Sequence, residues 1–243
     1  MKKITLIAVF ITALSVTSFG QAGFGIQAGA SLTGSRVEVE TNNSTDKIKT
    51  DSRFGFVAGL VAAIPLGPVS FRPEINFIQK GYKYDNSQTV LGFTTTTESK
   101  ARFNYVEVPL NFTYDIAAGG GKFFLGLGPV VGFGINGNFK DKTTVTGLPE
   151  QSSSTKIKFD GDDDANDDYS HLKRIDFGGD VLVGYQMSNG LLFNVGYTLG
   201  LSDIAVTNNT SLKNSGLALK VGYLFGCNKS KDKSSSKTST GGM

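Results

Sequence analysis

Residues 54–64 read Phe-Gly-Phe-Val-Ala-Gly-Leu-Val-Ala-Ala-Ile. Taken two residues at a time, this stretch places Phe54, Phe56 and Leu60 on one side and mostly glycine, valine and alanine on the other. A period of two residues is typical of a β-strand whose two faces meet different surroundings. The stretch therefore predicts a strand with one strongly apolar face.

The same alternation recurs along most of the chain. Each run is roughly 9 to 11 residues long, the length that a tilted strand needs to cross a bilayer core. The other alternating segments are 24–32, 69–77, 106–114, 123–133, 175–185, 191–201 and 217–225. A soluble sandwich would also alternate, so the connections between the segments have to decide.

These connections alternate strictly between long and short. The short ones, rich in Gly, Pro and Asn as tight turns require, are 65–68, 116–122 and 188–190. The long ones are 33–52, 83–101, 137–174 and 202–214. Short periplasmic turns and long outer loops are typical of outer-membrane barrels. We therefore predict an all-β fold, an eight-stranded antiparallel up-and-down transmembrane β-barrel with both termini in the periplasm.

The N-terminal residues predict a secretory signal peptide over residues 1–20. A basic start at residues 1–3 is followed by an apolar stretch over 4–16, and small residues Ser18 and Gly20 lie before the expected cleavage site. The apolar stretch is too short for a transmembrane helix. A mature chain that stays in a membrane must then do so as a closed barrel.

The barrel domain is expected over residues 21–225. Residues 226–243 are rich in Ser, Lys, Thr and Gly and predict a disordered periplasmic tail. Cys227 is the only cysteine, which excludes a disulfide framework. The formal net charge is only +3, and no basic patch suggests nucleic acid as a partner. No cofactor is expected.

Residues 71–82, Phe-Arg-Pro-Glu-Ile-Asn-Phe-Ile-Gln-Lys-Gly-Tyr, resemble the third strand of a Bacteroidota outer-membrane β-barrel family often labelled PorT-like or "porin family". Residues 104–110 resemble the aromatic, acidic and proline pattern of that family, and similar motifs follow at 126–129, 176–178 and 197–204. The resemblance implies a barrel of the OmpA/OmpX size class in the outer membrane of a Gram-negative bacterium. It implies little about activity.

The last predicted strand ends in Tyr223-Leu224-Phe225. A final strand with a terminal aromatic is what the barrel-assembly machinery typically recognises, so Tyr223 and Phe225 form a candidate assembly signal. The partners expected for this chain are that machinery, outer-membrane lipid and lipopolysaccharide, with a surface or periplasmic protein as a further possibility.

Six charged side chains lie on the predicted inward face of the strands. An eight-stranded barrel is only just wide enough for side chains to fill, so these charges are expected to pair with one another. They are Arg72, Glu74, Glu107, Asp176, Asp180 and Lys220. The expected pairing is Arg72 with Glu74 and Glu107, as a structural plug. A gated ion or proton path is the alternative.

The single histidine, His171, follows Ser170 in the third long connection. Adjacent residues of an extended strand point to opposite faces, so these two side chains do not readily share a proton. We expect no enzymatic activity. A catalytic triad using a serine of another loop is the alternative.

The same connection carries a dense set of oxygen ligands. It holds Asp160, Asp162, Asp164, Asn166 and Asp168, a set that could bind Ca²⁺ weakly or bridge to lipopolysaccharide phosphates. It lacks the glycine and the distal glutamate of an EF-hand loop. A solvated acidic loop is the favoured interpretation.

The sequence therefore indicates an integral outer-membrane barrel with a structural or interaction role, such as envelope integrity, surface binding or adhesion, or support of a secretion system, and not a wide diffusion pore. One alternative is a secreted soluble lipocalin-like barrel, whose apolar face would point inward around a small apolar ligand. Such a barrel typically carries a Trp near its first strand, and this chain has no Trp. The other alternative is a narrow solute or ion channel.

Overall fold

The computed structural model describes residues 22–41, 44–162, 167–207 and 209–226. The predicted signal peptide and residues 227–243 of the predicted tail lie outside this part of the chain. The strands of the described residues are β1 (Gly23–Thr41), β2 (Ser44–Ile48), β3 (Asp51–Pro65), β4 (Val69–Lys80), β5 (Tyr82–Val90), β6 (Phe93–Ala118), β7 (Gly121–Val145), β8 (Gln151–Phe159), β9 (Tyr169–Leu172), β10 (Ile175–Met187), β11 (Leu191–Gly200) and β12 (Thr210–Phe225). Among these residues, no helix has the length and apolar character needed to cross a membrane.

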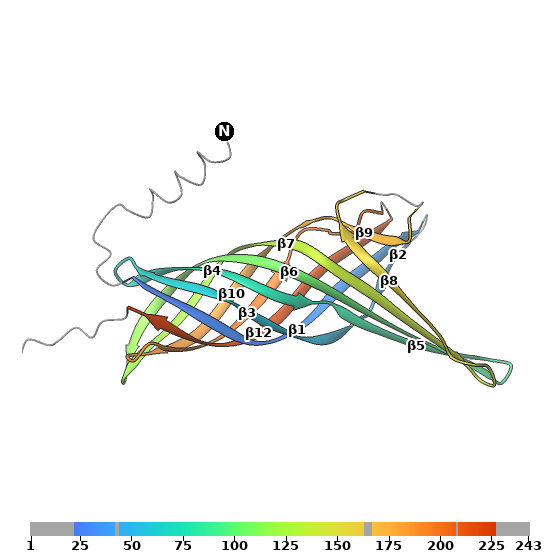
Figure 1. Ribbon diagram of the computed structural model, residues 1–243, viewed down its shortest axis with the longest axis horizontal. Coiled ribbons are helices and arrows are strands. Elements are labelled where there is room, and N and C mark those ends of the chain that lie inside the picture. Colours follow the sequence, from blue (N-terminus) through green and yellow to red (C-terminus); the bar gives the residue numbers. More distant parts are fainter. Residues whose placement is uncertain (1–21, 42–43, 163–166, 208, 227–243) are drawn as a thin grey trace, which may run out of the picture.

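Within the described residues, eight of the strands pair antiparallel in a closed ring (Figure 1). The order around the ring is β1, β3, β4, β6, β7, β10, β11 and β12. The ring closes where β12 returns to β1, with Phe24 opposite Phe225 and Val39 opposite Thr210. Closure leaves no unpaired edge in the ring. The predicted eight-stranded antiparallel barrel is confirmed.

The short connections lie together at one end of the barrel, which we call the terminal rim because β1 begins and β12 ends there (Figure 1). They join β3 to β4 after Pro65, β6 to β7 after Ala118, and β10 to β11 after Met187. Gly67, Gly119 and Gly190 adopt positive φ angles in these turns, a conformation that glycine tolerates best. The predicted alternation of short and long connections is present.

Outward-facing side chains of the ring are apolar on every strand. They include Phe24, Ile26, Phe54, Leu60, Ile75, Phe112, Leu125, Leu127, Val181, Val183, Phe193, Val195, Leu219 and Val221, all exposed. Aromatic rings pair near the terminal rim, where Phe123 lies 4.7 Å from Tyr185 and Tyr223 lies 5.1 Å from Phe225 between centroids. An apolar band edged by aromatic rings suits a surface covered by lipid. A lipocalin-like barrel would have the reverse arrangement.

Two of the expected long loops are not loops over most of their length. β5 pairs with β6 as far as Val90 opposite Phe93, and β8 pairs with β7 from Gln151 to Ile157. β6 and β7 are 26 and 25 residues long and pair with each other beyond the barrel. Their distal parts are rich in Thr, whose branched side chain favours extended backbone.

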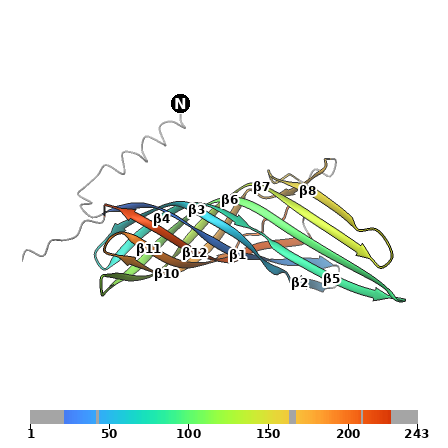
Figure 2. The same cartoon turned by 60° about the horizontal axis from the view of Figure 1, so that its bottom comes forward.

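These extensions form a four-stranded arm that projects from the rim opposite the termini (Figures 1 and 2). We define the arm as residues 82–101 and 137–159. The first long connection, 33–52, is also mostly strand, since β1 continues to Thr41 and pairs with β2. The prediction of loops was therefore wrong for the arm, where Thr-rich segments such as 93–97 extend the ladder.

The barrel interior contains two apolar clusters separated by polar side chains. The cluster at the terminal rim consists of Val61, Ala63, Phe124, Leu182, Leu192 and Leu224. The cluster near the base of the arm, which we call the apolar cap, includes Val37, Ile78, Phe103, Tyr105, Phe159, Leu172, Ile204 and Leu212. Ile78 lies on the inward face of β4 and is buried, because that face changes there from polar to apolar.

Candidate functional site

Between the two apolar clusters, the structure buries all six charged residues that were expected to face inward. In the middle of this layer, Glu74 of β4 forms an ion pair with Lys220 of β12. The same carboxylate accepts hydrogen bonds from the side-chain amides of Gln27, at 2.7 Å, and Asn76, at 2.7 Å. Charge-assisted hydrogen bonds of this kind are what make a buried carboxylate tolerable.

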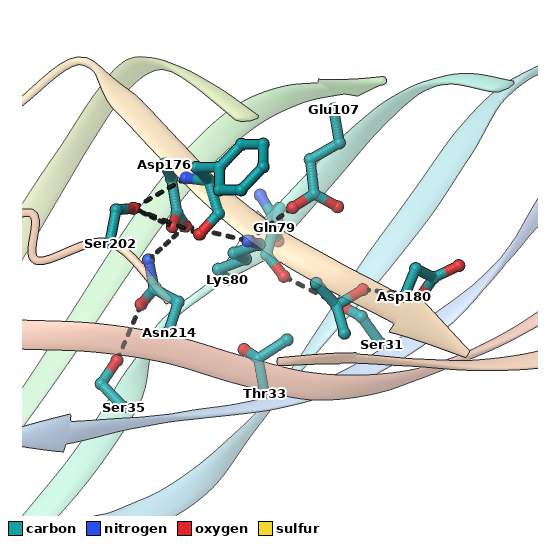
Figure 3. A network of polar contacts seen from close by, with 12 residues as sticks. Ser31, Thr33, Ser35, Gln79, Lys80, Glu107, Asp176, Asp180, Ser202 and Asn214 are labelled. Carbon is teal, nitrogen blue, oxygen red and sulfur yellow. Dashed lines mark hydrogen bonds and ion pairs between the residues drawn. The ribbon is translucent and has the colours of Figure 1, made fainter. Parts of the chain in front are cut away.

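Toward the arm, Lys80 lies between two carboxylates (Figure 3). Its Nζ lies 2.5 Å from Glu107 Oε1 and 3.1 Å from Asp176 Oδ2. Asn214 donates a hydrogen bond to Asp176 at 3.0 Å and accepts one from Ser35 at 2.9 Å. This group connects strands on opposite sides of the barrel directly beneath the apolar cap.

Toward the terminal rim, Arg72 fills the interior. Its guanidinium donates to Gln186 at 2.9 Å and to Thr113 at 3.1 Å, and lies 3.6 Å from Asp115. The Cζ atom of Arg72 also lies 4.0 Å from the ring centre of Phe124, a cation–π geometry. Arg72 therefore joins the polar layer to the apolar cluster at the terminal rim.

The expected pairing of Arg72 with Glu74 and Glu107 was wrong. Glu74 pairs with Lys220, Glu107 pairs with Lys80, and Arg72 pairs with Asp115. Residues 72 and 74 of one strand are about 7 Å apart along its axis. They therefore reach different levels of the lumen, where Arg72 pairs with Asp115 of the neighbouring strand β6 and Glu74 pairs with Lys220 of β12 across the lumen.

Asp180 has a different environment from the other carboxylates of this layer. It accepts hydrogen bonds from Asn111 at 2.8 Å and from Thr198 at 3.0 Å. A neutral amide and a hydroxyl thus satisfy this carboxylate directly. The pattern shows a layer built from hydrogen bonds as much as from ion pairs.

Sequence reasoning missed several members of this layer, among them Lys80, Asp115, Gln186 and Asn214. Continuing the two-residue alternation to the ends of the strands would have identified some of these residues. Positions 72, 74, 76, 78 and 80 share one face of β4, and position 115 continues the inward face of β6 from 107 and 111. Gln186 and Asn214 carried no signal beyond their phase.

His171 lies on β9 at the base of the arm. Its Nδ1 lies 2.8 Å from Asp160 and its Nε2 lies 3.0 Å from Asp167. Hydrogen bonds that the imidazole donates, first to the carboxylate of Asp167 and then to that of Asp160, raise the pKa of His171 above its ordinary value of 6.5. Hydrogen bonds from Lys158, at 2.6 Å, and His171 lower the pKa of Asp167 to about 2. Both ring nitrogens of His171 thus contact carboxylates.

The predicted calcium ligands are only partly within the described residues. Asp164 and Asn166 lie outside them, and Asp160 directs one oxygen at His171. Among the described residues, no group of three or more acidic, histidine or cysteine side chains is arranged to hold a metal ion. The Ca²⁺ hypothesis stays a prediction.

The predicted assembly signal lies at the seam where the barrel closes. Phe225 is the residue of β12 opposite Phe24 of β1, and its ring packs against Tyr223. Both side chains point outward and are exposed. An aromatic pair is therefore available on the outer surface of the last strand.

The sequence matches the family model described as "Outer membrane protein beta-barrel domain" over residues 15–206. None of the curated proteins matches the sequence.

Solved structures with a similar fold include Ail of Yersinia pestis, with 17% identity, a TM-score of 0.35, and coverage of 84% of this chain and 99% of Ail. Neisserial surface protein A has 14% identity, a TM-score of 0.38, and coverage of 83% and 97%.

OprG of Pseudomonas aeruginosa has 14% identity, a TM-score of 0.45, and coverage of 84% of this chain and 96% of OprG. At these identities the structural likenesses concern the fold alone. The family model, in contrast, covers well over half of the 243 residues. The chain is a Gram-negative outer-membrane β-barrel protein and belongs to the outer membrane protein β-barrel domain family.

Proposed function

We propose that this barrel is a closed anchor that displays its arm outside the cell, where the arm contacts a partner in an adhesive or surface-binding role. The observation that carries the proposal is the continuation of β6 and β7 beyond the barrel as one paired ladder. A barrel that served only to seal the envelope would need no such extension. A long, ordered arm holds an interaction surface away from the membrane.

The lengths of the connections at the two rims indicate how the barrel is oriented in the outer membrane. In outer-membrane barrels the short turns face the periplasm and the long connections face outward. The short turns and both ends of the ring share one rim, so the termini are expected in the periplasm and the arm outside. Lipid and lipopolysaccharide would then cover the apolar band, and the barrel-assembly machinery would recognise Tyr223 and Phe225.

The lumen supports an anchor better than a channel. Contacts of Lys80 with Asp176, of Glu74 with Lys220 and of Arg72 with Gln186 span its width. Apolar clusters lie above and below them. We infer that this layer is a structural plug and that no ion path runs through it. The contacts of His171 with Asp160 and Asp167 give it a bridging role, and we expect no hydrolytic activity.

The finer assignment to Bacteroidota and to PorT-like barrels rests on the motifs at residues 71–82 and 104–110. Export by a signal peptide over residues 1–20 belongs to the same proposal. Detection of a mature N-terminus at Gln21 would test the export route. A secretion-system role would require a periplasmic contact, which the residues 226–243 could supply.

The test is a variant with a shortened arm. Asp85 is opposite Glu98 and Lys140 is opposite Ser154, so residues 86–97 and 141–153 can each be replaced by an Asn-Gly turn at these pairs. Bacteria carrying the full chain or the shortened variant are compared for adherence to cultured cells and for autoaggregation. We expect the shortened variant to insert normally and to lose adherence.

A control variant exchanges Ser87 and Thr96, which face each other in the arm, so that its length and composition are kept. That variant should adhere like the full chain. If the shortened variant adheres equally well but makes cells sensitive to detergent, the role is structural and the adhesive proposal is wrong.

A further inference from the structure

The end of the arm, which we call the tip, exposes four large apolar side chains. Val90 and Phe93 flank the β5–β6 turn and are 64% and 62% exposed, and Leu91 within that turn is 93% exposed. Leu148 in the turn between β7 and β8 is 64% exposed. These residues lie far from the lipid-covered band of the barrel (Figure 1). The membrane that holds the barrel therefore does not explain them.

The two turns form one surface because they are joined to each other. Thr146 N–H donates to the carbonyl of Thr94 at 3.0 Å, and Thr94 N–H donates to the hydroxyl of Thr146 at 3.1 Å. Thr95 lies opposite Val145 in the β6–β7 ladder. The two turns therefore end the arm together, and each exposes apolar side chains there.

Leu91 has a backbone conformation that leucine does not favour. Its φ is 51°, and among the described residues it is the one non-glycine residue with a positive φ. In a two-residue hairpin turn with Gly92, Asn or Asp at this position avoids most of the strain. Neither burial nor turn geometry therefore explains the leucine at this position.

The β5–β6 side of the tip carries no charge over a considerable depth. Residues 86–97 and 143–149 contain no Asp, Glu, Lys or Arg, and at about 3.3 Å per residue the uncharged end of β5 extends about 17 Å back from Leu91. On the β7–β8 side, Glu150 follows Leu148 closely and is paired with Lys142 at 2.8 Å. The tip therefore presents no unpaired charge that would attract an acidic or basic partner.

The backbone groups of the tip are largely satisfied within it. Val90 pairs with Phe93, and Leu148 N–H donates to the carbonyl of Val145 at 3.0 Å. Because unsatisfied backbone groups make lipid contact costly, a self-bonded turn can lose water at low cost. An apolar side chain that enters the boundary between headgroups and acyl chains gains free energy in proportion to its buried area.

We propose that the tip inserts into the headgroup–acyl boundary of a second lipid bilayer facing the outer membrane, and that neutral lipid suffices. This rests on the proposed adhesive role of the arm and names its partner class. A protein partner would be expected to add hydrogen bonds to the apolar contact. The four apolar side chains of the tip offer no hydrogen-bonding group, and the backbone at both turns is bonded within the tip.

The absence of Trp from the chain gives a direct test. The Phe93→Trp variant carries its only indole at the tip. The full chain of this variant is held in lipid nanodiscs and mixed with phosphatidylcholine vesicles whose acyl chains carry bromine. We expect the emission to shift to the blue and most of it to be quenched. Leu66→Trp places the indole on the terminal rim, where Leu66 is also exposed, and reports any bromolipid that exchanges into the nanodisc.

A second variant, Leu91→Asn with Leu148→Ser, removes two apolar side chains while favouring the turn. Its partitioning to vesicles should fall about tenfold for each leucine replaced. If vesicles leave the emission of the Phe93→Trp variant unchanged, the proposal is overturned. It is also overturned if the emission shifts with protein concentration in the absence of vesicles, because that result would indicate a second copy of the chain as the partner. If shortening the arm abolishes adherence while the indole stays unquenched, the adhesive role stands and the lipid partner is wrong.

Discussion

The barrel and the arm share the strands β6 and β7 but are stabilised in different ways. Within the barrel, inward and outward residues differ sharply, every strand is paired on both sides, and charges such as Lys80 and Glu107 are buried against each other. In the arm, both faces are partly exposed, and cross-strand hydroxyl pairs such as Ser87 with Thr96 and Thr89 with Thr94 are 2.9 Å apart.

The difference shows that one continuous ladder can serve two environments. The closed ring removes its edges and buries its polar groups in a filled lumen, so single changes inside it should be costly. The arm keeps its backbone bonds but has little to bury, so single changes there should be nearly neutral. The following predictions test that contrast.

The largest effect is expected for Glu74→Gln in the barrel. The change leaves Lys220 buried without its counter-charge, and breaking a buried ion pair in this way costs about 3–5 kcal/mol. The free energy of unfolding by urea in lipid vesicles should fall by about that amount. A loss under ~1 kcal/mol would mean that water reaches the lumen and that the layer is not a plug.

A smaller effect is expected for Gly134→Ala at the junction of barrel and arm. A Cβ at position 134 would lie 2.2 Å from the ring of Phe159, which packs there in the apolar cap. Moving a ring in a packed core costs about 1–3 kcal/mol. Loss of protection of β8 amides in hydrogen exchange, with the ring strands unchanged, would be the measured result.

The contact of His171 with Asp160 and Asp167 should make the base of the arm sensitive to pH. The pKa of His171 is raised by these carboxylates, so their stabilisation is fully present below pH 6.5 and is lost as the pH rises through the raised pKa. The protection of the Tyr169–Leu172 amides, which is their exchange rate relative to the intrinsic rate at each pH, should fall at alkaline pH, and His171→Gln should abolish that fall in protection. Faster exchange on acidification from pH 6.5 to pH 5 would contradict it.

The smallest effect is expected for Glu150→Gln in the arm. Glu150 lies 2.8 Å from Lys142, but both side chains are about half exposed. Exposed pairs contribute about 0–1 kcal/mol. The urea midpoint should stay within error of the unsubstituted chain, which makes this variant the matched comparison for Glu74→Gln. A loss similar to that of Glu74→Gln would remove the distinction between the regions.

The sequence was sufficient to predict the ring, because alternation and connection lengths are local properties of the chain. Residues 54–64 alternate over their whole length, and the short turns are marked by Gly and Pro. The arm was missed because Thr-rich segments such as 93–101 have no amphipathic contrast to mark them as strands. Their structure comes from pairing with neighbours, which single-segment patterns do not reveal.

For the candidate site, the sequence predicted which charged residues face inward but not which ones pair. Phase along a strand depends only on the period, whereas pairing across the lumen depends on strand tilt and register. Lys80 was missed because the strand predicted over residues 69–77 stops short of it. The tip was missed because Val90, Leu91 and Phe93 lie within 83–101 and Leu148 lies within 137–174, segments that were assigned as connections between strands.

Gel mobility of the protein from isolated outer membranes, with and without boiling in detergent, tests the central claim most directly. A closed, lipid-embedded ring with a filled lumen should stay folded in detergent when the sample is not heated. The unheated protein should therefore migrate faster than the boiled chain. The same shift should persist when the arm is shortened. A single band that does not shift, recovered in the soluble fraction, would contradict the account.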